Sequence, residues 1–211
     1  MTKLYIIRHG ESLGNSKSLF LGHTDLGLTE KGHLQAELTG EFLKDKNIDV
    51  FYSSDLKRAY ETCCHIADKK NKTVNIHKGL REIYAGKWEG VEFNILNEKF
   101  PSFKVWLEDM SKVRCDDGES VEELKERVVN TFCEIANKNH GKTVCITTHA
   151  TPIRIMSTVF RKLPLDKIME FPWVPNSSVT EVEYSKGEWN LIREGFKDHL
   201  GKNSTELPSN V

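Results

Sequence analysis

Short apolar runs alternate with helical segments along most of this chain, and that alternation constrains the fold more than any other feature. The apolar runs at residues 4–7, 50–52 and 144–146 have the length of β-strands, and Val74 to Ile76 is read as another short strand. Residues 4–7 are apolar throughout, as expected of a strand buried on both faces of a sheet. Strands that alternate with helices favour a largely parallel sheet covered on both faces. We therefore predict an α/β fold with three layers, α/β/α, around a mostly parallel central sheet.

Helical patterns separate the first strands. Leu34, Leu38 and Phe42 recur every four residues, and this spacing predicts a helix after the first strand. The Ser-Ser-Asp run at residues 53–55 offers side-chain oxygens that can cap a helix from about residue 56 to 69. Each of the first two long strands is therefore expected to lead into a helix.

The second half of the chain carries a helix signal and a hairpin signal. Ser120 and Glu123 have the spacing of a capping box, which predicts the start of a long helix ending near residue 138. Residues 178–184 and 189–192 flank a Lys-Gly turn and predict an antiparallel hairpin. We therefore expect one antiparallel edge strand on the otherwise parallel sheet.

Residues 83–117 interrupt the alternation of strands and helices. They contain six aromatic residues and Pro101, and predict a small, mostly helical cap inserted into the domain. The segment 197–211 is polar, which predicts a flexible tail. Because no internal repeat or long linker divides the chain, we expect a single domain over residues 1–211.

The composition excludes some classes of partner. Lys and Arg number 30 against 31 Asp and Glu, so no bulk charge draws the protein to nucleic acid or membrane. The five cysteines lack the spacing of a zinc site or disulfide framework, which favours free thiols in a reducing compartment. The N-terminal apolar run is too short for a signal peptide, and no run approaches a membrane span. We expect a cytoplasmic protein that is a monomer or homodimer.

Polar residues cluster where three of the predicted strands end. Arg8-His9-Gly10 follows the first strand, and Ser53-Ser54-Asp55 follows the second, with Arg58 just beyond it. The strand at 144–146 runs into Thr147-Thr148-His149. Ligands of open α/β sheets bind just outside the carboxyl ends of the strands. If the three strands are parallel neighbours, two arginines and two histidines converge on one crevice.

Such a crevice suits a phosphate group. Guanidinium groups such as those of Arg8 and Arg58 bind phosphate oxygens bidentately, and Gly10 lets the backbone approach a ligand closely. Thr151 is a plausible N-cap and Pro152 a natural first residue of the next helix, whose free amides would then face the anion. The residues therefore indicate phosphoryl chemistry without a metal motif.

Each of these residues also has a purely structural interpretation. A single histidine such as His149 at a strand end is more often structural than catalytic, and an isolated Arg58 would be a solvated helix residue. The occurrence of such residues at three strand ends together favours function.

The sequence resembles the histidine phosphatase superfamily, which includes the cofactor-dependent phosphoglycerate mutases. The resemblance covers most of the chain, with order and spacing preserved. The matching stretches are RHGESLGN at 8–15, GHTDLGLTEKG at 22–32, SSDLKRAYET at 53–62, LREIYAGKWEG at 80–90, DGES at 117–120 and THATPIR at 148–154.

The resemblance implies a mechanism in which His9 attacks the phosphorus atom and becomes a phosphohistidine. Arg8, Arg58 and His149 would hold the phosphoryl oxygens during transfer. Glu82 would protonate the leaving group and then act as the base for water.

Other implied features concern the nucleophile and the phosphate contacts. The nearby arginines should lower the pKa of His9, and a backbone carbonyl could fix its tautomer by accepting from the other ring nitrogen. Asn15, Gly22 and Ala150 match positions that bind the substrate phosphate. The other six histidines match nothing catalytic. We expect neither a metal nor another cofactor.

Departures from the mutase pattern favour the phosphatase branch. Leu21 stands where mutases usually have Ser or Thr, and Ala150-Thr151 replaces their Gly-Asn. The cationic residues that mutases carry after the general acid, which grip the second phosphate, are absent between residues 84 and 114. We predict a metal-independent phosphatase that hydrolyses small-molecule phosphate monoesters. The alternatives are a cofactor-dependent phosphoglycerate mutase, a catalytically inactive phosphate-binding module and, less favoured, a metal-dependent hydrolase.

The aromatic residues of the cap have two interpretations. They could line an apolar pocket for the leaving group, or they could pack the cap onto the sheet. The residues concerned are Tyr84, Trp88, Phe93, Phe103 and Trp106. No residue identifies the substrate.

Overall fold

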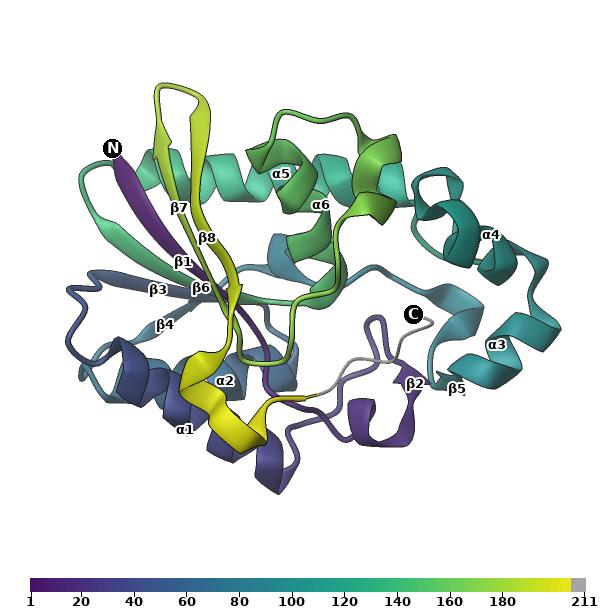
Figure 1. Ribbon diagram of the computed structural model, residues 1–211, viewed down its shortest axis with the longest axis horizontal. Helices are drawn as coiled ribbons and strands as arrows, with labels where there is room; N and C mark the ends of the chain where they lie inside the picture. The colour runs from purple at the N-terminus through teal and green to yellow at the C-terminus, as the bar shows by residue number, and fades with distance from the viewer. Residues whose placement is uncertain (206–211) are drawn as a thin grey trace.

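The computed structural model describes residues 1–205, and its centre is a six-stranded sheet in the order β4-β3-β6-β1-β7-β8 (Figure 1). β1, β3, β4 and β6 are parallel, β7 runs antiparallel to β1, and β8 pairs antiparallel with β7 as the outermost strand. The mostly parallel sheet and the antiparallel hairpin at its edge are confirmed. The strands are β1 Thr2–Arg8, β3 Val50–Ser53, β4 Val74–Ile76, β6 Thr143–Thr148, β7 Val179–Ser185 and β8 Glu188–Phe196.

Helices cover both faces of this sheet, as the three-layer prediction requires (Figure 1). Leu4 and Ile6 of β1 join the larger apolar core, whereas Tyr5 and Ile7 join a second core on the other face. The larger core includes residues of α5 Val121–Lys138 and α6 Ala150–Phe160, and the second includes residues of α1 Glu30–Leu43 and α2 Lys57–Asp68. Successive residues of a strand point to opposite faces, so the all-apolar first strand is buried on both sides.

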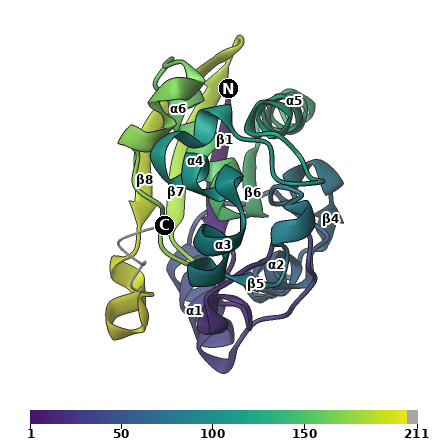
Figure 2. The same ribbon diagram turned by 90° about the vertical axis from the view of Figure 1, so that its right-hand side faces the viewer.

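A small cap lies beyond the carboxyl ends of the parallel strands (Figures 1 and 2). It contains α3 Phe93–Lys99 and α4 Pro101–Asp109, with Pro101 at the first turn of α4. β5 Val91–Glu92 pairs with β2 Leu19–Phe20, from the loop after β1. The ring of Phe20 makes edge-on contacts with four aromatic rings of the cap segment. The cap is thus anchored to the segment that follows the Arg8-His9-Gly10 turn.

One of the three predicted helix caps is confirmed. The Ser120 hydroxyl and the Glu123 carboxylate form the predicted capping box at the start of α5. The predicted caps of α2 and α6 are wrong. The N-cap of α2 is Leu56, and α6 begins at Ala150 with His149 as its N-cap. Ser54, just before α2, bonds instead to His149 at the start of α6, and Asp55 pairs with Arg81.

The buried face of α1 differs from the one that its leucines suggest. Leu34 is 42 % exposed, whereas Ala36 and Leu43 are fully buried. The helix packs closely against α2, and a Cβ on Gly40 would lie 2.9 Å from the backbone oxygen of His65. Because the two backbones approach so closely, small residues rather than leucines occupy most of the contact face.

The predicted flexible tail needs correction in its first half. Residues 198–203 form 3₁₀ turns that pack against α1, and Leu200 is buried. Residues 206–211 of that predicted tail lie outside the described part of the chain. Within residues 1–205, no helix combines the length and apolarity needed to cross a membrane.

Candidate active site

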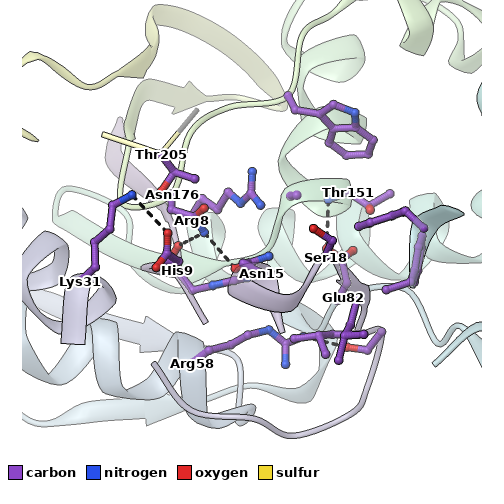
Figure 3. A pocket seen from close by; sticks show the side chains of 18 of the residues that line it. Arg8, His9, Asn15, Ser18, Lys31, Arg58, Glu82, Thr151, Asn176 and Thr205 are labelled. Carbon is purple, nitrogen blue, oxygen red and sulfur yellow. Dashed lines mark hydrogen bonds and ion pairs between the residues drawn. The ribbon is translucent and has the colours of Figure 1, made fainter. Parts of the chain in front are cut away.

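A cavity of about 540 Å³ opens where β1, β3 and β6 end (Figure 3). It lies between these strand ends and the cap. Seven of the eight predicted site residues line it: Arg8, His9, Asn15, Gly22, Arg58, Glu82 and Ala150. The eighth, His149, is fully buried, and its ring centroid lies 5.1 Å from that of His9. The fold therefore brings together residues that lie up to 142 positions apart in the sequence.

His9 is held in the form that a nucleophile needs. Its backbone N–H donates to Thr148 O at 3.0 Å, and Nδ1 lies 2.7 Å from Gly10 O. Because a carbonyl can only accept, Nδ1 carries the proton and Nε2 of the neutral ring keeps its lone pair. Burial holds the pKa of His9 well below 6.5, and the charges of Arg58 and Arg8 lower it further. The expected pKa shift and the carbonyl-fixed tautomer are both confirmed.

Arg8 and Arg58 are buried cations whose guanidinium groups bond to backbone oxygens. Arg58 donates from Nη2 to Gly22 O and from Nη1 to Thr24 O, each at 2.8 Å, and Arg8 Nη1 donates to Val174 O at 2.7 Å. Burial lowers the pKa of each arginine to about 10, which leaves both charged at neutral pH. Neutral carbonyl groups fix these side chains without cancelling their charge. The cavity therefore has a rigid cationic wall.

His149 is placed by a serine whose role the sequence did not suggest. His149 Nε2 and Ser54 Oγ are 2.9 Å apart, and both residues are completely buried. Burial, followed by the charge of Arg58, holds the pKa of His149 well below 6.5. Ser54 lies just after β3, a position where the sequence suggests a helix cap. Its bond to His149 could not be predicted, because the two residues are 95 positions apart.

Glu82 bonds to the N-terminus of α6. One carboxylate oxygen accepts from Ile83 N at 2.9 Å and the other from Thr151 N at 3.2 Å. Arg127 of α5 donates to the backbone oxygens of Gly79, Arg81 and Glu82, and so fixes the loop that carries this carboxylate. Sequence reasoning missed Arg127, which belongs to no motif.

The two glycines near the cationic wall have structural reasons for being glycine. Gly22 has φ +51°, and a Cβ there would lie 2.7 Å from the Ala85 side chain. A Cβ on Gly10 would lie 2.5 Å from Gly32 O in the first turn of α1. Gly10 therefore permits a close approach of the backbone to α1, and its approach to a ligand stays a prediction.

Asn15 is oriented by its neighbours. Its Oδ1 accepts from Ser12 N at 3.0 Å and from Ser12 Oγ at 2.9 Å. The amide nitrogen is the end of this side chain left to meet an anion in the cavity.

The opposite wall of the cavity is aromatic. Phe93 and Trp106 of the cap line it together with Phe20 and Trp173. The other three cap aromatics of the sequence prediction do not line it. Trp88 and Phe103 are buried in the cap core, and Tyr84 is 47 % exposed beside His23. Two of the five cap aromatics thus line the cavity and two pack the cap, while Tyr84 does neither; a role for the lining pair in binding the leaving group stays a prediction.

Comparisons with known proteins give a consistent result. Residues 4–196 match a family model described as the histidine phosphatase superfamily (branch 1). Phosphoserine phosphatase 1 of Hydrogenobacter thermophilus is 32% identical over 203 residues, covering 96% of each chain. The structure of Bacillus stearothermophilus YhfR superposes with a TM-score of 0.91 at 28% identity, covering 95% of this chain and 100% of that one. Phosphoserine phosphatase from Entamoeba histolytica, solved with 3-phosphoglyceric acid, gives a TM-score of 0.83 at 28% identity with the same coverage.

Proposed function

The chain belongs to the histidine phosphatase superfamily and is a phosphatase of it, and we propose that it hydrolyses small-molecule phosphate monoesters through a phosphohistidine on His9. One observation carries this proposal. His9 is a neutral imidazole whose Nδ1 proton is held by Gly10 O, so that Nε2 is an available nucleophile between two buried arginines. A neutral nucleophile beside fixed cations suits attack on a phosphate dianion.

In the first step, Nε2 of His9 forms a bond to phosphorus while the bond to the ester oxygen breaks. The leaving oxygen takes a proton from protonated Glu82, and the alcohol departs. In the second step, Glu82 takes a proton from water, whose oxygen attacks the phosphorus and releases His9 and inorganic phosphate. Glu82 is suited to both steps because it lies in the cavity wall beside the start of α6.

The remaining site residues stabilise the transferring phosphoryl group. Arg8 and Arg58 present guanidinium groups to its oxygens, and His149 donates from beside the nucleophile. Asn15, Gly22 and Ala150 contribute further donors from the cavity wall. Because these groups are fixed by hydrogen bonds before substrate arrives, little reorganisation is needed during transfer.

We propose that the enzyme needs no metal or other cofactor. The two buried guanidinium groups supply the positive charge that a metal ion supplies in other phosphoryl-transfer enzymes. Chelator-resistant activity is the corresponding expectation.

The cap favours hydrolysis over a mutase reaction. A mutase must hold a doubly anionic intermediate while it reorients, which requires cations at both ends of the cavity. Of the cavity-lining residues within the described chain, the cap contributes Phe93 and Trp106, which carry no charge. Leu21, also in the wall, lacks the hydroxyl that mutases usually carry there.

The partner of this site is a small molecule. Phosphoserine and 3-phosphoglycerate are the first esters to test, because the names and ligand of similar proteins include them. The even balance of charged residues disfavours nucleic acid as a partner, and the five free thiols favour the cytoplasm. The expected state is a monomer or homodimer.

The decisive experiment measures phosphate release from a panel of monoesters, with chelator and without bisphosphoglycerate. The wild type should hydrolyse at least one ester, and the H9A variant should be inactive while H140A, altered at an exposed histidine, keeps full activity. Wild-type protein denatured in alkali during turnover should carry phosphate that is stable in alkali and lost in acid, as a phosphohistidine requires, and H9A should carry none. Conversion of 3- to 2-phosphoglycerate only after bisphosphoglycerate is added would establish the mutase alternative. Phosphate binding without turnover in either assay would establish the binding module.

A further inference from the structure

The loop before β7 contacts the nucleophile-bearing turn at several points. Val174 O accepts from Arg8 Nη1 at 2.7 Å, and Ser177 N donates to Arg8 O at 2.9 Å. Asn176 Nδ2 donates to His9 O at 2.9 Å. A segment more than 160 positions away in the sequence therefore fixes the side chain of Arg8 and the backbone of His9.

Asn176 also contacts the amide of Asn15, and this second contact fixes which end of each amide faces the other. Its Nδ2 lies 3.4 Å from Asn15 Oδ1, which already accepts from the backbone N–H of Ser12 (Figure 3). Because that N–H can only donate, the Asn15 oxygen must face Ser12, and Asn176 must present its nitrogen. One amide nitrogen thus joins the nucleophile backbone to a phosphate-binding side chain.

Two features at Asn176 and Ser177 are unfavourable for the stability of the fold. Asn176 is 1 % exposed, and its Oδ1 has no hydrogen-bond partner within residues 1–205. The next residue, Ser177, adopts a left-handed conformation with φ +55°. Buried unpaired acceptors and left-handed non-glycine residues are both unfavourable and concentrate at functional sites.

We propose that Asn176 is a positioning residue of the phosphoryl-transfer site. It holds His9 O and orients the amide of Asn15, so that the nucleophile and a phosphate donor keep a fixed separation. It touches no reacting atom. This inference rests on the proposed function, since it assigns a task within the same site.

Two variants of Asn176 test whether this residue positions the site or only fills space. N176A removes the donor without adding charge, and N176D keeps the shape of the side chain but places an oxygen against two acceptors. Both should lower kcat/KM about ten- to a hundredfold, mainly through kcat, because small displacements near a reacting centre have effects of this size. N190D is the matched control, because Asn190 is exposed on β8, and its activity should stay within about twofold of the wild type.

Coupling to Asn15 gives the sharper readout. In an N15A background, N176A should lower kcat/KM by much less than in the wild type, because part of its effect passes through Asn15. Inorganic phosphate should bind N176A several-fold more weakly than the wild type in calorimetry, and this binding assay needs no turnover. If wild-type protein hydrolyses no ester, the proposed function fails, whereas the binding comparison still tests Asn176.

Three outcomes would overturn the inference. N176A could match the wild type in kcat/KM and phosphate affinity. Alternatively, N176D alone could lose activity, which would show that the loss comes from the added negative charge and not from the missing amide donor. Full additivity of N15A and N176A would show that the two amides act separately. If N176A does not fold, N176S removes the same amide donor without adding charge and provides the comparison of phosphate affinity with the wild type.

Discussion

The two ends of the cavity are built by different physical means. At the end that we propose binds phosphate, here called the phosphate end, Arg8, Arg58 and His149 are buried polar groups, fixed by directional hydrogen bonds to carbonyls or to a hydroxyl. At the cap end, Phe20 and Trp106 meet through edge-on ring contacts within an apolar cluster. A directional bond is lost with small displacements, whereas apolar packing tolerates exchanges of similar volume. The phosphate end is therefore suited to fixed chemistry, and the cap end to the choice of leaving group.

The largest effect is expected from removing Arg58. R58A should lower kcat/KM about 10³- to 10⁵-fold, the range typical of a transition-state arginine in phosphoryl transfer. R58K keeps the charge but lacks the fork that meets Gly22 O and Thr24 O, so it should recover only part of the loss. Steady-state phosphate release measures both variants, with R114A at an exposed ion pair as control. Equal activity of R58K and wild type would show that charge alone matters at this end.

At the cap end, W106A should have a large effect on the free energy of unfolding and only a small effect on kcat. Trp106 is 2 % exposed and contacts the rings of Phe20, Trp88 and Trp173. Its truncation should cost about 3–5 kcal/mol of unfolding free energy. Urea denaturation measures this loss, and V105A, at an exposed position on the same helix, should change it by less than about 0.5 kcal/mol.

Kinetics on W106A then tests the division between the two ends. The KM for esters with aromatic leaving groups should rise, while kcat for a small ester should stay within a few-fold of the wild type. A loss of kcat as large as that of R58A would contradict the division, because it would mean that the cap positions the phosphoryl group.

The phosphate end should also make stability depend on pH. His9 and His149 have pKa values well below 6.5 in the folded protein. Below pH 6.5 the unfolded chain takes up protons that the folded chain excludes, so stability falls as pH drops through 6.5 and levels off above it. Each imidazole should lower the free energy of unfolding at pH 5.5 by up to about 1.4 kcal/mol relative to its value well above pH 6.5.

Urea denaturation of wild type and H9Q at pH 5.5 and 7.5 isolates one of these contributions. The wild type should lose about 1 kcal/mol more than H9Q on acidification. F93A, altered at the cap end, should show the same pH dependence as the wild type. If H9Q loses as much stability on acidification as the wild type does, the pKa of His9 is not lowered in the folded protein as its burial implies.

The sequence predicted those parts of the fold and site that have local patterns. The strands and the capping box of α5 follow from runs of a few residues, and the strand-end residues Arg8, His9 and Arg58 stand directly beside predicted elements. The converging site followed from these positions because parallel strands end at one edge of a sheet.

The parts that could not be predicted depend on distant partners. Ser54 was interpreted as a helix cap because its bond to His149 spans 95 positions, and Asn176 meets His9 across 167. The exposed Leu34 shows the same limit, since the contact face of α1 is set by how closely α2 approaches it. A local pattern contains no information on such contacts.

The smallest effect is expected from Lys31, a partly exposed cation that sharpens the contrast with the buried Arg58. Lys31 lines the cavity, but its side chain is 41% exposed and its Nζ lies 3.3 Å from a Glu11 carboxylate oxygen. Solvent screens such a charge, so K31A should lower kcat/KM for a dianionic ester only about two- to threefold at low salt. The screening length falls from roughly 30 Å at 0.01 M to 3 Å at 1 M salt, which should abolish even this difference. The deficit of R58A should persist at 1 M salt, because Arg58 is buried and, in the proposed mechanism, contacts the phosphate directly where ions cannot screen it. A K31A deficit that survives at 1 M salt would place Lys31 in direct contact with substrate and extend the cationic wall to the cavity mouth.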